Sequence, residues 1–65
     1  MAMKVTFAHM TARAVTAERQ GEYLGAAALW DAASNLASKT ANIQWCQYRN
    51  RVCQSLHVLR KAEGL

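Results

Sequence analysis

The chain contains no proline and 13 alanines among its 65 residues, and this combination constrains its fold more than any other feature. Alanine has the highest helix propensity of the common residues, whereas proline interrupts a helix most strongly. Short alanine side chains also let neighbouring helices approach closely. We therefore predict an all-α fold whose helices are separated only by the few turn signals in the sequence.

Two helices are predicted before the middle of the chain, within a single domain that covers residues 1–65. The first covers about residues 6–20, and Gly21 ends it because glycine tolerates the left-handed conformation at a helix terminus. Its apolar residues share one face: Met3, Phe7, Met10, Ala14 and Ala17. The second covers about residues 23–38. Its apolar stripe has large side chains toward its ends and small ones between them, and consists of Tyr23, Ala26, Ala27, Trp30, Ala33 and Ala37.

The third helix is predicted over about residues 43–61, with Asn42 as its N-cap and Gly64 as a stop signal. Its predicted core-facing arc consists of Trp45, Val52, Leu56 and Leu59, flanked by Tyr48 and Cys53. Both connections are short, so neighbouring helices should run antiparallel in a three-helix arrangement.

The turn region resembles a tetratricopeptide helix-turn-helix, in which glycine permits the turn and alanines permit close packing. The residues that carry this resemblance are Gly21, Tyr23, Ala26, Trp30 and Ala33. It covers one repeat at most, and one repeat cannot bury its apolar face alone, so the third helix must supply the missing neighbour. An ordinary helical hairpin is the alternative interpretation.

Charge and hydropathy point to a cytoplasmic protein without a membrane span. The net charge of +4 favours nucleic acid or an acidic protein surface as a partner, but the basic residues form no run. No stretch of about 20 apolar residues is present, and the first residues lack a signal-peptide pattern. Both cysteines are expected to be reduced thiols.

No pattern of catalytic groups is present, and we predict that the protein is not an enzyme and holds no cofactor. A glycine-rich phosphate loop and a nucleophile with a base at credible spacing are both missing from the sequence. Cys46, Cys53 and His57 lie along one side of the third helix and suggest a metal site. Three ligands on one rigid helix fall short of a tetrahedral zinc site, so we expect no metal.

Apolar residues outside the predicted core are candidates for partner binding. Val5, Ala8, Ala12 and Val15 form a second stripe on the first helix, and Val58 lies off the main arc of the third. Such a stripe is typical of a surface that contacts another protein or a second copy, and we favour a homo-oligomer, a dimer in particular. Scattered surface alanines are the alternative.

Arg49 is the remaining candidate, because a charge on the apolar arc of the third helix needs a partner. Its stem could pack on Trp45 while its guanidinium pairs with Glu18, Glu22 or Asp31. Alternatively, it meets an acidic group on another protein, which its planar fork would bind in a bidentate manner.

One further pattern extends over more than half of the chain and consists of Glu18, Gly21, Tyr23, Ala26, Ala27, Leu29, Trp30, Ala33, Trp45, Arg49 and Cys53. With this pattern the sequence resembles the AraC negative regulator family. This resemblance implies a small bacterial regulator that binds AraC/XylS-type transcription activators and inhibits them by direct contact. The same pattern partly resembles PerC-like transcription activators, which implies a DNA-binding regulator instead.

Two other functions therefore stay open beside activator binding. One is DNA binding through the third helix, although its basic and polar residues encircle that helix instead of lining one face. The residues concerned are Arg49, Asn50, Arg51, Arg60 and Lys61. The other is a tetratricopeptide-like structural or chaperone subunit.

Overall fold

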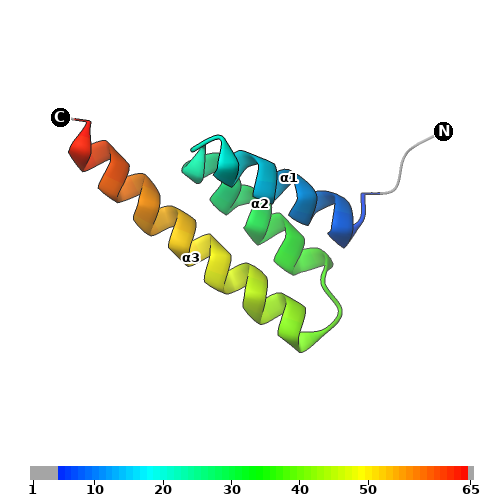
Figure 1. Ribbon diagram of the computed structural model, residues 1–65. Coiled ribbons are helices and arrows are strands. Elements are labelled where there is room, and N and C mark those ends of the chain that lie inside the picture. Colours follow the sequence, from blue (N-terminus) through cyan, green and yellow to red (C-terminus); the bar gives the residue numbers. More distant parts are fainter. Residues whose placement is uncertain (1–4, 65) are drawn as a thin grey trace.

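A computed structural model describes residues 5–64 of the chain, and this range folds into three packed helices without a β-strand (Figure 1). The helices are α1 (Phe7–Arg19), α2 (Tyr23–Leu36) and α3 (Thr40–Glu63). The predicted all-α class and three-helix arrangement are thus confirmed. Met3, which was predicted to share the apolar face of the first helix, lies outside the described residues.

The turn between α1 and α2 has the predicted geometry. Gly21 has a φ of 77°, in the left-handed region that favours glycine. Its N–H donates to the Glu18 carbonyl at 3.0 Å, and the Glu22 N–H donates to the Ala17 carbonyl at 2.9 Å. These two bonds satisfy carbonyls that the end of α1 would otherwise leave free. At the other end of α1, the Thr6 hydroxyl accepts the His9 N–H and caps the helix.

The boundaries around the second connection differ from the prediction. The extended backbone of Ala37 ends α2 at Leu36, two residues early. Asn42 was predicted as the N-cap of the third helix, but it lies inside the first turn of α3. The Ile43 N–H already bonds to the Lys39 carbonyl, so helical bonding starts at Lys39, which caps the helix without a side-chain bond. No residue between Lys39 and Asn42 interrupts a helix.

The three helices form one layer in which α2 lies between α1 and α3, and successive helices run antiparallel (Figure 1). The layer measures 44 × 28 × 14 Å. Its smallest dimension is close to the diameter of one helix with its side chains, about 10–12 Å. Because α2 packs along both neighbours, α1 and α3 meet only through a few side chains that reach across it.

The core of this layer consists mainly of small side chains around Trp30, which is 1% exposed. The other buried apolar residues are Ala14, Ala17, Ala26, Ala27, Ala33, Cys46 and Cys53. The predicted core arc of the third helix is confirmed only in part. Cys53, at its flank, is buried and Val52 and Leu56 are half-buried, but Trp45 and Leu59 are 43% and 58% exposed. The alanines of α2 let α3 approach so closely that thiols, and not large side chains, fit the interface.

Candidate protein-interaction surfaces

The carboxylate of Glu18, in the last turn of α1, joins all three helices. It accepts the indole N–H of Trp30 from α2, with Nε1 to Oε1 at 2.6 Å. From α3, the guanidinium of Arg49 donates in a bidentate manner, with Nε to Oε1 at 3.2 Å and Nη2 to Oε2 at 2.6 Å. The thiol of Cys53 donates to Oε1 at 3.1 Å. We call these four residues the Glu18 cluster.

The cluster holds Glu18 in its ionised form. Burial by itself would raise the pKa of Glu18, but hydrogen bonds from Arg49, Cys53 and Trp30 outweigh it and hold this pKa below its ordinary value. The hydrogen bond to Glu18 raises the pKa of Arg49. Burial and the adjacent carboxylate raise the pKa of the Cys53 thiol to about 11, so Cys53 stays protonated, donates a hydrogen bond to Glu18 and is not a reactive thiolate.

The structure gives Arg49 the first of its two predicted roles, because its guanidinium pairs with Glu18 and is only 29% exposed. Arg49 is thus engaged within the chain and is not offered to a partner. Most of the other residues that carry the family resemblance also have places in the fold. Ala26, Ala27 and Ala33 are in the core, Tyr23 and Leu29 pack against it, Gly21 forms the turn, and Trp45 contacts the rings of Trp30 and Phe7.

A contact that the sequence did not predict ties the far end of α3 to the first turn. The Arg60 guanidinium donates from Nη1 to the Gly21 carbonyl at 3.0 Å and lies 5.8 Å from the ring centroid of Tyr23. Arg60 is one of the residues that the sequence offered for DNA binding, and the structure instead engages it within the chain. No local sequence signal marks the contact, because its partners are 39 positions apart.

The predicted second stripe of α1 is smaller than expected. Val5 is 52% exposed, and Ala8 and Ala12 are also exposed. Val15 is instead half-buried and packs against the core, so it is not part of a free surface. What remains is one valine and two alanines, which offer little area to a partner.

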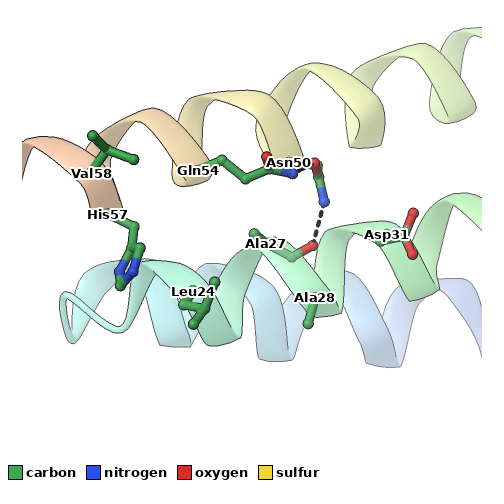
Figure 2. Close-up of a pocket in the computed structure, with 8 residues that line it drawn as sticks. All are labelled: Leu24, Ala27, Ala28, Asp31, Asn50, Gln54, His57 and Val58. Carbon is green, nitrogen blue, oxygen red and sulfur yellow. Dashed lines mark hydrogen bonds between the residues drawn. The ribbon is translucent and has the colours of Figure 1, made fainter.

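A groove of about 590 Å³ runs between α2 and α3 (Figure 2). Leu24 and Val58 lie at its end near the first turn and are 61% and 65% exposed. Asp31 lies toward its other end. Between them, the Asn50 amide donates from Nδ2 to the Ala27 carbonyl at 2.7 Å and bridges the two helices. Val58 is thus the one predicted partner residue that lies in a hollow, which we call the α2–α3 groove.

The electrostatic character of the α2–α3 groove differs from that of the whole chain. The protein carries a net charge of +4, yet the carboxylate of Asp31 is the charged group that lines this groove, beside His57 and neutral side chains. Across residues 5–64, the only ion pair is that of Arg49 with Glu18, so Asp31 forms no ion pair with another of these residues. The groove therefore offers apolar side chains at one end and an unpaired carboxylate at the other.

A further apolar surface lies on the part of α3 that does not face the buried Cys46 and Cys53. Its large members are Trp45, Tyr48 and Leu59, which are 43%, 57% and 58% exposed, with Val52 half-buried between them. Trp45 packs edge-on against Trp30, with ring centroids 4.9 Å apart. These residues were predicted to face the core, and the structure instead leaves much of their surface open.

Within the described part of the chain, no three His, Cys, Asp or Glu side chains converge as metal ligands, and no helix is long and apolar enough to span a bilayer. Comparisons with known protein families, with curated protein sequences and with solved structures find no match to this chain. The geometry of residues 5–64 is consequently the basis for assigning a function.

Proposed function

We propose that this protein is a small cytoplasmic regulator that binds an AraC/XylS-type transcription activator and inhibits it by contact, without catalysis. One observation carries the proposal: the core around Trp30 consists of alanines and cysteines, whereas seven large apolar side chains are 43–65% exposed. Contiguous exposed apolar surface is typical of proteins that bind other proteins, and two of these side chains, Leu24 and Val58, line one groove. The resemblance to the AraC negative regulators, from Glu18 to Cys53, supports the choice of partner.

The α2–α3 groove is the surface that best suits this contact. A hollow between two helices accepts the apolar face of a third helix, which would rest its side chains on Leu24 and Val58. Asp31 then selects a helix that carries an arginine or lysine opposite it. The activator segment that we propose is therefore an amphipathic helix with a basic residue on the edge of its apolar face.

The test is binding of the purified protein to purified AraC/XylS-type activators, with Val58→Asp as the diagnostic variant. Val58 is 65% exposed, so its replacement removes no core contact, but it places a charge where an apolar partner must dock. We expect a loss of affinity of about tenfold or more, which corresponds to about 1.4 kcal/mol. Asp31→Lys should weaken binding as well, by repelling the basic residue of the partner helix.

Gln44→Asp is the matched control, because it puts the same charge on an exposed position of α3 outside the groove. It should leave activator affinity unchanged. If no activator binds, or if Val58→Asp binds as well as the parent chain, the proposal is wrong. Retention of promoter DNA alone, with a steep salt dependence, would favour a DNA-binding regulator instead.

A further inference from the structure

A second hollow, of about 270 Å³, adjoins the α2–α3 groove beyond the Asn50 bridge, on the side of Asp31 (Figure 2). Asp31 and Asn50 line both hollows, so the two form one depression between the helices. From Leu24 to Ser34 of α2 this depression extends over about 15 Å, at 1.5 Å per residue, which is the length of about three helical turns. We call the second hollow the polar hollow, and its lining consists of Asp31, Ser34, Gln47, Asn50 and Arg51.

Two charges of opposite sign lie on the two walls of the polar hollow. Asp31 comes from α2 and Arg51 from α3, and both side chains are exposed. Neither forms an ion pair with another residue of the range 5–64. The Asn50 amide and the Ser34 hydroxyl, in contrast, already form hydrogen bonds within the chain. Asp31 and Arg51 are therefore the charged groups that the polar hollow offers to a partner.

We propose that Asp31 and Arg51 select a helix with opposite charges on the two edges of its apolar face, and that they fix the direction in which it docks. This rests on the proposed docking of an amphipathic helix in the groove, but not on which protein supplies that helix. The partner helix carries a basic residue on the edge that meets α2 and an acidic residue on the edge that meets α3, because complementary charges set the register of an interface. Its apolar side chains rest on Leu24 and Val58.

The direction follows from the geometry of a helix in a groove. A docked helix can be turned end for end while its apolar face still points into the groove, but this rotation exchanges the edges that meet α2 and α3. The reversed helix would place its acidic edge against Asp31 and its basic edge against Arg51. Like charges opposite each other are unfavourable. Walls of opposite charge therefore accept one direction of the helix and disfavour the other.

Designed peptides of about 18 residues, long enough to form a helix on the groove, test the charge preference. All carry leucines along the apolar face and the same net charge. One has lysine on one edge and glutamate on the other, one has lysine on both edges, and one has glutamate on both. By fluorescence anisotropy, the parent chain should bind the mixed peptide about fivefold more tightly than either of the others, as expected for exposed ion pairs. High salt should reduce this preference by screening.

Variants of the two walls should change which peptide is preferred. Arg51→Glu makes both walls acidic and should favour the lysine-edged peptide, whereas Asp31→Lys makes both walls basic and should favour the glutamate-edged peptide. Both side chains are exposed, so the helical circular dichroism should persist. Arg13→Glu is the matched control, because it makes the same change of charge at an exposed position of α1 outside both hollows. It should keep the preference of the parent chain.

A paramagnetic label at the N-terminus of the mixed peptide tests the direction of docking. In the nuclear magnetic resonance spectrum of the parent chain, the label should broaden amide signals at one end of the depression, either near Leu24 or near Ser34. Asp31→Arg combined with Arg51→Asp exchanges the two walls. In this double variant the label should broaden the signals of the opposite end, with nearly the same affinity. Broadening at both ends of the parent chain, or at the same end in both chains, would contradict the proposed direction.

Peptide binding and activator binding are separate measurements, so the two proposals can fail separately. Equal affinity of the parent chain for the three peptides, or binding of none, would overturn the selection by Asp31 and Arg51, as would an Arg13→Glu chain that behaves like Arg51→Glu. If an activator still binds in that case, the proposed function stands. If the mixed peptide is preferred but no activator binds, the charge selection stands and the proposed function is wrong.

Discussion

Glu18 shows how a single carboxylate can fix the relative positions of three helices whose core is made of small side chains. Its oxygens accept hydrogen bonds from the side chains of Trp30, Arg49 and Cys53. An exposed ion pair contributes about 0–1 kcal/mol, whereas a hydrogen bond to a charged group contributes about 1.5–3 kcal/mol. Since Glu18 is 19% exposed and also binds an indole and a thiol, the cluster belongs with the second case.

Glu18→Gln should lower the free energy of unfolding by about 2 kcal/mol, because the amide keeps the shape but not the charge that Arg49 needs. Urea unfolding followed by circular dichroism measures this loss. Glu63→Gln is the control, since Glu63 is exposed near the end of α3 and should change stability by no more than about 0.5 kcal/mol. Equal effects of the two variants would contradict a structural role of the cluster.

The pH dependence of stability gives a second measurement on the same variant. The pKa of Glu18 is lower in the folded chain than its ordinary value of 4.5, so the folded state favours the carboxylate. This contribution is fully present above pH 4.5 and is lost as the pH falls through the folded pKa. The parent chain should therefore lose stability below about pH 4.5 by more than Glu18→Gln does. Parallel pH profiles would exclude this linkage.

Gly21 and Gly25, near the start of α2, differ in whether their position requires glycine. Gly21 lies at the boundary, has a positive φ, and a Cβ placed on it would clash with the Arg60 guanidinium. Gly25 lies inside α2, where a Cβ would meet nothing within 4 Å. Since alanine differs from glycine by one methyl group, the pair compares a position where that methyl group is strained and obstructed with one where it is tolerated.

Gly21→Ala should destabilise the chain by about 1–2 kcal/mol, the cost of a left-handed conformation for an alanine. Displacement of Arg60 from the Gly21 carbonyl adds to this loss. Gly25→Ala should have the opposite sign and stabilise the chain by about 0.5–1 kcal/mol, because alanine is the better helix former. Thermal unfolding of both variants measures the difference. A Gly21→Ala chain as stable as the parent would mean that the turn can adopt another geometry.

The helices and the first turn followed from the sequence because they depend on local chemistry, such as the glycine at position 21 and the run of helix formers after it. The pairing of Arg49 with Glu18 was also among the predicted alternatives. The rotation of α3 was not predictable from hydrophobicity alone. Ranking side chains by hydrophobicity selects Trp45 and Leu59 for the core, but the alanine surface of α2 accepts the smaller Cys46 and Cys53 instead. The α2–α3 groove depends on that rotation, and Val58 is the only residue of its lining that was predicted to contact another protein.

Taken as a whole, the molecule is a single layer of helices with one large buried side chain. A chain of 65 residues has a total stability of about 3–10 kcal/mol, at about 0.05–0.15 kcal/mol per residue. Both broad faces of a layer 14 Å thick lie close to solvent, so little apolar area is available to replace a lost core contact. Docking of a partner in the α2–α3 groove would cover a surface that the single chain leaves open.

Trp30→Ala should therefore unfold most of the chain. Replacement of a buried tryptophan by alanine costs about 3–5 kcal/mol, which is comparable to the whole stability of a domain of this size. It also removes the N–H that Glu18 accepts. Circular dichroism at a fixed protein concentration should show a large loss of helix, and the cooperative thermal transition should disappear.

Two further variants test whether the loss of stability in Trp30→Ala comes from the core position of Trp30 or from shortening any apolar side chain. Trp30→Phe keeps an aromatic ring but not the indole N–H, so it should fold with a loss of about 1–2 kcal/mol. Leu36→Ala truncates a side chain on the same helix that is 44% exposed, so its loss should be smaller than that of either Trp30 variant. A Trp30→Ala chain that unfolds cooperatively at the parent temperature would mean that the core is not centred on Trp30. The stability of the layer would then have to come from the exposed faces, through association between copies.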